Sequence, residues 1–342
     1  MGERGLKLTT YFDERDRTGD RLLADALIDV YARHRVHSSA LLQGIEGFGA
    51  KHRLQTQRLL SLSEDLPVIA TAVDCATRLE AVLMEVTELR SNGLVTLAPT
   101  RMLGAGEGEA SNLGLAATAS ESARLTVYVG RRQRVGGLPA HRAVVASMHR
   151  GGMAGATVLL GVDGTRDGER RRARLLSANT DVPLMVIGVG DGEAVARVVA
   201  ELSRLPVPPA LSLQEVQICK RDGQRLGEPR LPALGGARGH TQAQQLTVYV
   251  AEQDRQEGAA VYGTLVRRLR RQGALGATAV RGVWGYVGEG RPHGERVWSV
   301  RRHVPVMVVI VDRPQRIGRW FEIVDEVTAR AALVTGEPVS VP

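Results

Sequence analysis

A glycine-rich stretch followed by basic residues is the part of the sequence that most clearly suggests ligand chemistry. Gly44, Gly47 and Gly49 are closely spaced, and charged side chains follow at once. Glycine permits positive φ and close approach of the backbone, so that successive N–H groups can form an anion-binding concavity. Cationic side chains would add charge-assisted hydrogen bonds. The candidate ligand-binding residues of this stretch are Gly44, Gly47, Phe48, Gly49, Lys51, His52, Arg53 and Arg58.

The same residues also have plainer explanations. The glycines would simply turn the chain, and the basic side chains would form a solvated face of a loop. Phe48 would either stack on a ligand base or staple the loop to the domain. Glu46 and Asp163, which occupy the same register of an internal repeat, are expected to form salt bridges at a sheet edge instead of acting as catalytic acids.

Catalytic and metal-binding patterns do not emerge from the sequence. No Ser/His/Asp set is tied together by a motif, and Cys75 and Cys219 lack the spacing of zinc ligands. The eight histidines are scattered along the chain. We therefore expect a protein that is not an enzyme and needs no cofactor or metal. A nucleotide or another anion remains the expected effector.

An internal repeat is the strongest signal in the sequence. The segment Leu8-Thr9-Thr10-Tyr11-Phe12 recurs at 125–129 and 246–250, and a proline follows Leu66, Val182 and Val304. The motif Gly44-Ile45-Glu46-Gly47 returns as Gly161-Val162-Asp163-Gly164 and Gly282-Val283-Trp284-Gly285. The third copy adds the candidate site residues Gly282, Trp284, Gly285 and Tyr286. The expected domains are 1–102, 124–220 with a degenerate loop, and 244–342, joined by linkers at 103–123 and 221–243.

Each copy is predicted to have the element order β-α-β-β-α-β. In the first copy, the opening strand alternates around Leu8, and a helix carries an apolar stripe from Leu22 to Tyr31. A strand over Ser39–Ile45, a long polar segment, a strand over Val68–Val73, a helix over Leu79–Leu89 and a strand beginning at Leu94 complete the copy. Gly93 is expected to stop the second helix.

This order indicates an α+β fold of three tandem ferredoxin-like domains, with two helices on one face of each four-stranded sheet. The other face is half apolar and must find a partner. Three such faces in one chain can cover one another, which predicts an intrachain pseudo-trimer. The Thr9/Tyr11, Thr126/Tyr128 and Thr247/Tyr249 faces are then expected to point inward.

Composition limits the other function classes. The chain has 342 residues, 43% of them hydrophobic, and a formal charge of +8, but residues 1–102 hold 13 basic and 14 acidic side chains. Aromatic residues make up only 4%, so nucleic-acid binding is not favoured. No apolar run reaches about 18 residues, and Met1-Gly2-Glu3-Arg4 does not begin a signal peptide. We expect a cytoplasmic protein without direct membrane insertion.

The first copy closely resembles the domain-of-unknown-function family 190, which is grouped with PII-like signalling proteins. The resemblance rests on the opening Leu-Thr-x-Tyr strand, Gly44-Ile45-Glu46-Gly47-Phe48-Gly49, the segment 58–67 and Gly93-Leu94-Val95-Thr96-Leu97. It implies a ferredoxin-like fold, trimeric assembly and a mobile effector loop after the second strand. It also implies ligands in clefts between subunits, often adenine nucleotides. PII proteins bind phosphates with a glycine- and lysine-containing loop before the last strand. In this sequence the corresponding connection is the short segment 90–93, which differs from that loop.

The expected function is therefore that of a PII-like sensor. It would bind a small effector at the clefts between its domains and regulate a partner protein through the loop at 48–64. The partner is unknown, with a membrane transporter or channel among the candidates, and the chain is expected to be monomeric. The alternatives are a ligandless pseudo-trimeric scaffold and a nucleic-acid binder.

Overall fold

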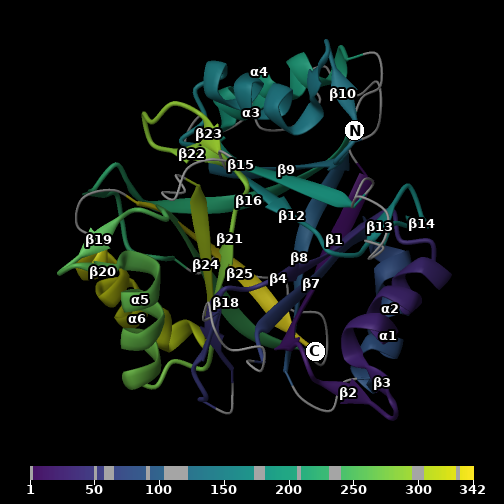
Figure 1. The fold of residues 1–342 in the computed structure, drawn as a ribbon, viewed down its shortest axis with the longest axis horizontal. Coiled ribbons are helices and arrows are strands. Elements are labelled where there is room, and N and C mark those ends of the chain that lie inside the picture. Colours follow the sequence, from purple (N-terminus) through teal and green to yellow (C-terminus); the bar gives the residue numbers. More distant parts are fainter. Residues whose placement is uncertain are drawn as a thin grey trace.

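The computed structural model describes residues 3–49, 52–57, 65–89, 93–103, 122–172, 182–205, 209–230, 240–294, 304–328 and 332–342. It is an α+β protein, as expected, in which the same arrangement of strands and helices occurs three times (Figure 1). The candidate residues Lys51 and Arg58, and the whole segment 58–64 of the predicted effector loop, lie outside the described residues.

The first copy follows the predicted order. Its main elements are β1 (Glu3–Asp13), α1 (Leu23–Arg33), β4 (Ser38–Gln43), β7 (Pro67–Cys75), α2 (Ala76–Leu89) and β8 (Leu94–Leu103). Short strands form hairpins between them: β2 (Arg17–Thr18) with β3 (Arg21–Leu22), and β5 (Glu46–Phe48) with β6 (Gln55–Thr56).

The other two copies repeat these elements. The second has β9 (Ser122–Gly130), β10 (Arg134–Val135), β11 (Leu138–Pro139), α3 (Ala140–Arg150), β12 (Gly155–Leu160), β13 (Thr165–Arg166), β14 (Glu169–Arg170), β15 (Pro183–Asp191), α4 (Gly192–Ser203), β16 (Ala210–Arg221) and β17 (Gln224–Arg225). The third has β18 (Thr241–Ala251), β19 (Arg255–Gln256), β20 (Ala259–Ala260), α5 (Val261–Arg271), β21 (Ala277–Arg281), β22 (Trp284–Val287), β23 (His293–Gly294), β24 (Pro305–Asp312), α6 (Pro314–Val327) and β25 (Leu333–Val341).

Each copy forms a four-stranded antiparallel arrangement in which the first strand lies between the last and the third. The orders are β8-β1-β7-β4, β16-β9-β15-β12 and β25-β18-β24-β21. Two helices cover one face of each sheet and enclose a separate apolar core. In α1 the side chains of Leu23, Leu27 and Tyr31 are fully buried, whereas Leu22 precedes the helix and is 39% exposed.

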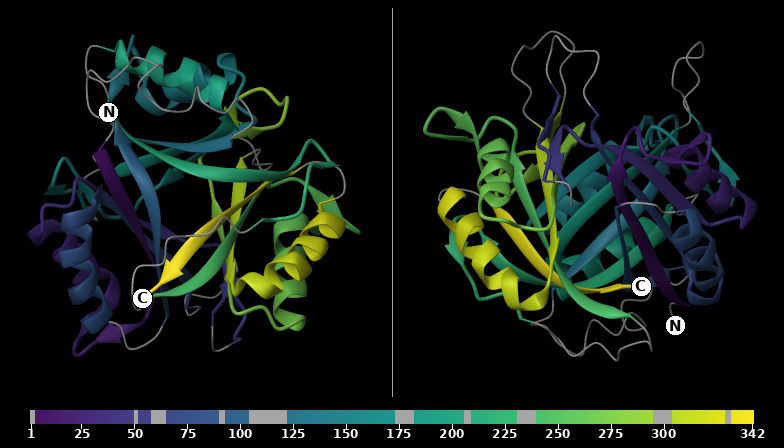
Figure 2. Two further views of the ribbon diagram at one scale, coloured as in Figure 1. Left: turned by 180° about the vertical axis from the view of Figure 1, so that it is seen from behind. Right: turned by 90° about the horizontal axis from the view of Figure 1, so that it is seen from below.

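The opposite faces of the three sheets meet in a fourth core. Tyr128 and Tyr249 belong to one buried cluster with residues of all three copies, and Tyr11 packs against it. Figures 1 and 2 show the helix pairs at the outside of the molecule and the strands at its centre. The last strands also pair across copies, because β16 contacts both β8 and β25, and β25 contacts β8. The inward orientation expected for the Thr/Tyr faces is therefore observed.

Two expected boundaries differ from the structure. The predicted strand 39–45 ends at Gln43, because Gly44 and Ile45 carry the chain off its own sheet and onto that of another copy. The stretch 221–243, predicted to be a linker, contains β17 and the first residues of β18. β18 is longer than the apolar alternation indicated, because its polar start pairs with β25.

Candidate functional site

The repeated glycine motif joins neighbouring copies. The N–H of its first glycine donates to the proline that opens the third strand of its own copy, as in Gly44 N to Pro67 O at 2.8 Å. The following N–H donates to the second strand of another copy. These bonds run from Ile45 to Ala279 (2.8 Å), from Val162 to Leu41 (2.8 Å) and from Val283 to Val158 (2.8 Å). The motif therefore links the first copy to the third, the third to the second and the second to the first.

Close backbone approach explains why glycine occupies these positions. A Cβ atom at Gly44 would lie 2.8 Å from the carbonyl oxygen of Pro67, and one at Gly47 would lie 2.7 Å from that of Ala277. At Gly164 and Gly285 a Cβ would overlap a backbone oxygen of the neighbouring copy. The structure thus uses Gly44, Gly47, Gly282 and Gly285, which the sequence indicated as ligand-binding residues, for contact between copies.

The third residue of the motif contacts the first helix of the neighbouring copy. Glu46 accepts from Arg267 of α5 at 3.1 Å, and burial raises the pKa of Glu46 while Arg267 opposes part of that rise. Asp163 pairs with Arg170 at 2.6 Å, and Arg170 in turn reaches Asp25 and Asp29 of α1. The predicted salt bridges of Glu46 and Asp163 are confirmed.

In the third copy, a tryptophan takes the place of the acid. The guanidinium carbon of Arg142 in α3 lies 4.1 Å from the centroid of the Trp284 ring. Tyr286 is 1% exposed, and its hydroxyl donates to the carbonyl of Met153 at 3.0 Å. These two candidate residues therefore pack between copies, where Tyr286 is inaccessible to a ligand.

A cleft of about 600 Å³ opens where the hairpin of the first copy meets the third copy. We call it the copy 1/copy 3 cleft. Ligand pockets generally have volumes of this order and mix apolar walls with a few polar groups. The apolar lining includes Phe12, Leu54, Leu94, Leu275, Val309 and Val311.

Charged and polar side chains line the same cleft. Arg15 and Arg53 are exposed, and Asp13, Asp16 and Asp65 line the cleft with them. Two of the carboxylates also hold the turn after β1: Asp65 accepts from the N–H of Arg15 at 2.8 Å, and Asp16 accepts from the N–H of Asp13 at 3.0 Å. The arrangement offers both cationic donors and carboxylate acceptors to a ligand.

The described part of the loop after β5 is tied to the third copy. Phe48 is 2% exposed and belongs to the apolar core of the third copy, which favours the stapling interpretation over ligand stacking. His52 stacks on Phe48 with ring centroids 5.9 Å apart, and its carbonyl accepts from Arg270 of α5 at 2.7 Å. Gly49 and Arg53 line the cleft.

Sequence reasoning missed most of this cleft, since only Phe48, Gly49 and Arg53 of its lining were among the candidate residues. Tyr11 lies near the end of β1, where the repeat indicated only packing surface, and Arg15 lies in the turn that follows β1. Leu275 and Gly276 follow α5 in the third copy, and no local pattern connects them with the first copy. The repeat itself was the available signal, because it implied that a neighbouring copy would complete each site.

The side chains that the structure describes include no cluster of three or more His, Cys, Asp or Glu residues suited to a metal ion. Cys219 is fully buried in the core of the third copy, and burial raises the pKa of its thiol to about 12. Among the same residues, no helix is long and apolar enough to cross a membrane.

Comparison with known proteins matches all three copies to one family. Residues 5–102, 122–218 and 243–341 each fit the sequence model of DUF190, described as "Uncharacterized ACR, COG1993". The chain belongs to the DUF190 family. The expected three tandem copies of this family are thereby confirmed.

Curated proteins similar to this chain include two UPF0166 proteins. One, from Aquifex aeolicus, is 30% identical over 77 residues, which are 22% of this chain and 73% of the relative. The other, from Methanocaldococcus jannaschii, is 29% identical over 92 residues, or 27% of this chain and 84% of the relative. Both relatives are therefore close to one copy in length.

A solved structure, the crystal structure of aspartate kinase from Synechocystis, aligns with 99% of this DUF190 chain and 45% of its own chain. The sequence identity is 14% and the TM-score is 0.25. A TM-score this low supports no inference about the fold or the function of this chain.

Proposed function

We propose that each copy is a ferredoxin-like domain of the PII-like class and that the chain is a covalent pseudo-trimer. The strand order with the first strand between the last and the third supports the domain assignment. The cyclic exchange of hairpins between copies supports the assembly. The relatives of one copy in length support it further, since three such chains would be needed to bury the same sheet faces.

We further propose that this assembly is a cytoplasmic sensor and not an enzyme. It binds a small effector in the copy 1/copy 3 cleft and regulates a partner protein. The observation that carries the proposal is the cleft itself, about 600 Å³ in volume and lined on one side by the loop after β5. A ligand there would contact Arg53 and Leu54 of this loop together with Leu275 of the third copy, and would thus couple the loop to the contact between copies.

The lining indicates an effector with an apolar body and a charged end. Leu94, Leu275 and Val311 would cover a planar or apolar group, while Arg15 and Arg53 would bind an anionic group. The carboxylates of Asp13 and Asp65 are suited to accept from hydroxyl or amino groups. A nucleotide combines these features, so nucleotides are the first class to test.

The effector proposal is tested by calorimetry and thermal unfolding with adenine nucleotides, other nucleotides and inorganic anions. Binding to the folded state raises the melting temperature. Arg15→Ala is expected to weaken binding by about tenfold, as loss of one charge-assisted hydrogen bond does. Arg132→Ala is the matched control, because Arg132 occupies the register of Arg15 in the second copy and is also exposed.

Leu275→Trp supplies a second test, because its larger ring would fill the cleft from the third copy. Leu275 is 43% exposed, so the substitution leaves the core intact. If no ligand tried binds the wild type, or if Leu275→Trp binds as tightly as the wild type, the cleft is not the effector site. A scaffold that docks its partner without a small ligand would then account better for the protein.

A further inference from the structure

The centre of the molecule, where the three first strands meet, is chemically asymmetric. Lys7, Arg124 and Gln245 occupy one register of the repeat, immediately before Leu8, Leu125 and Leu246. A trimer of identical chains would place three identical side chains there. This chain instead places two cations and one amide.

The opposing charge at this level comes from the third copy. Glu337 of β25 forms a buried salt bridge with Arg124, and their side chains are 4% and 3% exposed. Glu337 also accepts from Gln245 at 2.6 Å, and Arg124 donates to the hydroxyls of Thr335 at 3.0 Å and Thr247 at 3.2 Å. The carboxylate of Glu337 is therefore occupied by Arg124 and Gln245.

Lys7 is the second cation at this level. Its ammonium donates to the amide oxygen of Gln214 at 3.3 Å, a neutral acceptor. The charged groups that act on Lys7 are Arg124, which lowers its pKa, and Glu337, which raises it. Burial is the largest cause of the lowering, and the three effects together bring the pKa of Lys7 to about 8. Lys7, Arg124 and Glu337 thus leave one positive charge without a compensating carboxylate.

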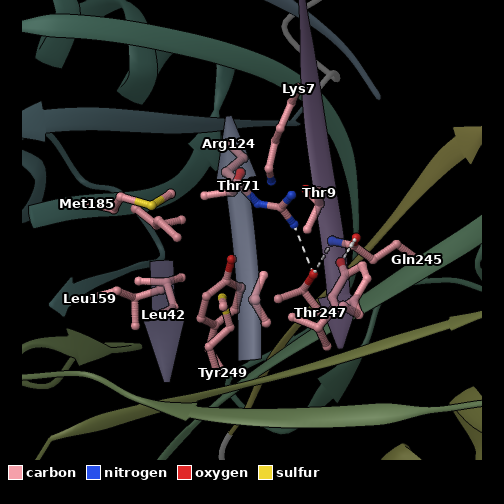
Figure 3. Close-up of a pocket in the computed structure, with 15 residues that line it drawn as sticks. Lys7, Thr9, Leu42, Thr71, Arg124, Leu159, Met185, Gln245, Thr247 and Tyr249 are labelled. Carbon is pink, nitrogen blue, oxygen red and sulfur yellow. Dashed lines mark hydrogen bonds between the residues drawn. The ribbon is translucent and has the colours of Figure 1, made fainter. Parts of the chain in front are cut away.

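A small cavity adjoins these groups, and we call it the central cavity. Its volume is about 30 Å³, and its lining includes Lys7, Thr71, Arg124, Thr247 and Tyr249. Figure 3 shows the Lys7 ammonium pointing toward the Arg124 guanidinium, and Tyr249 also lines the cavity. Arg124 Nε and the Thr71 hydroxyl are buried and have no hydrogen-bond partner among the described residues. Arg124 and Thr71 are each 2% exposed.

We propose that the central cavity binds a small monovalent anion such as chloride. A cavity of this size holds one water molecule or one ion. An anion is favoured over water because two cations approach the cavity, the buried Arg124 and the partly buried Lys7, and buried charges require compensation. The unpartnered N–H of Arg124 and the hydroxyl of Thr71 supply donors that an anion accepts. The site is separate from the copy 1/copy 3 cleft and does not depend on its effector.

The first test is the dependence of stability on chloride at constant ionic strength, with gluconate as the replacing anion. The melting temperature of the wild type is expected to rise by about 3 °C between about 5 mM and about 0.5 M chloride. Lys7→Met should lose this dependence. Thr71→Val, which changes shape little, should require several-fold more chloride. Arg150→Met is the control, because Arg150 lies in an exposed ion pair with Glu201.

The second test locates the ion. Crystals soaked in bromide should show an anomalous peak between the side chains of Lys7 and Arg124, and crystals of Lys7→Met should not. A chloride dependence equal in the wild type and in Lys7→Met would overturn the proposal, as would a bromide-soaked wild type without a peak in the central cavity. In either case the cavity holds water only.

Discussion

The carboxylate of Glu46 in the first copy lies 3.1 Å from the guanidinium of Arg267 in the third copy. The Glu46 side chain is 5% exposed and Arg267 43% exposed, so the carboxylate is the buried partner. Gly263, one turn before Arg267 in α5, leaves room for this carboxylate. At the other junctions Arg170, held by Asp163 of its own copy, pairs with Asp25 and Asp29 of the first copy, and Arg142 of the second copy lies over the Trp284 ring of the third. Each junction between copies is therefore chemically different.

The Glu46–Arg267 pair predicts a coupled effect on stability. Arg267→Met is expected to lower the free energy of unfolding by about 2 kcal/mol, because a buried carboxylate loses its cation. Glu46→Gln should cost about 1 kcal/mol, since Arg267 can turn toward water. Urea unfolding of both single variants and of the double variant provides the measurement. If the two losses simply add, the two side chains do not interact.

The glycine motif predicts a large effect at Gly164. A Cβ there would overlap the backbone oxygen of Ser39 in the first copy, so Gly164→Ala is expected to lower the free energy of unfolding by about 3 kcal/mol or more. Gly318→Ala is the control. Gly318 lies within α6 with no atom within 4 Å of the added Cβ, so alanine should stabilise by about 0.5 to 1 kcal/mol. Thermal and urea unfolding would measure both, and similar effects at the two positions would contradict the proposed role of the motif.

His141 predicts a dependence of stability on pH. Burial, with Arg142 and Arg131 nearby, lowers the pKa of His141 from its usual value of 6.5 to about 4. Between these values the unfolded chain binds a proton that the folded chain does not, so stability falls as the pH drops from about 6.5 to about 4. The loss is at most about 1.4 kcal/mol per pH unit for this one proton. His141→Gln should flatten this part of the stability profile, measured by urea unfolding, and an unchanged slope would assign it to other groups.

The anchor between Arg270 and the loop predicts a change in local dynamics. Arg270 donates to the carbonyl of His52 at 2.7 Å, and the N–H of Gln57 donates to Ile45 at 2.9 Å. Arg270→Ala should speed amide hydrogen exchange over 52–57 by several-fold while the main strands keep their protection. Arg271→Ala, an exposed neighbour, is the control. Bound effector should slow exchange over 52–57 in the wild type. Protection over 52–57 that neither Arg270→Ala nor any effector changes would contradict a regulatory role for this loop.

The sequence by itself determined the threefold repeat, the α+β class and the elements of each copy. Alternation around Leu8 and the apolar stripe, predicted from Leu22 and observed from Leu23 to Tyr31, are local consequences of strand and helix geometry, so they can be recognised without a structure. The inward face carrying Thr9 and Tyr11 also followed, because a half-apolar sheet face must be covered. The sequence also predicted that Glu46 and Asp163 would form salt bridges, but it did not identify their partners.

Only the tertiary structure decided what the glycine motif does and where the cleft lies. The role of Gly44 and Gly47 depends on which strand edge lies opposite them, and that edge, β21, belongs to a distant part of the chain. Leu275 joins Arg15 in one cleft for the same reason. Likewise, no local pattern in the sequence marks Lys7 and Arg124, each of which lies in the first strand of its copy. Their side chains lie close together only because the copies pack face to face. Burial between the copies makes an uncompensated positive charge there unfavourable.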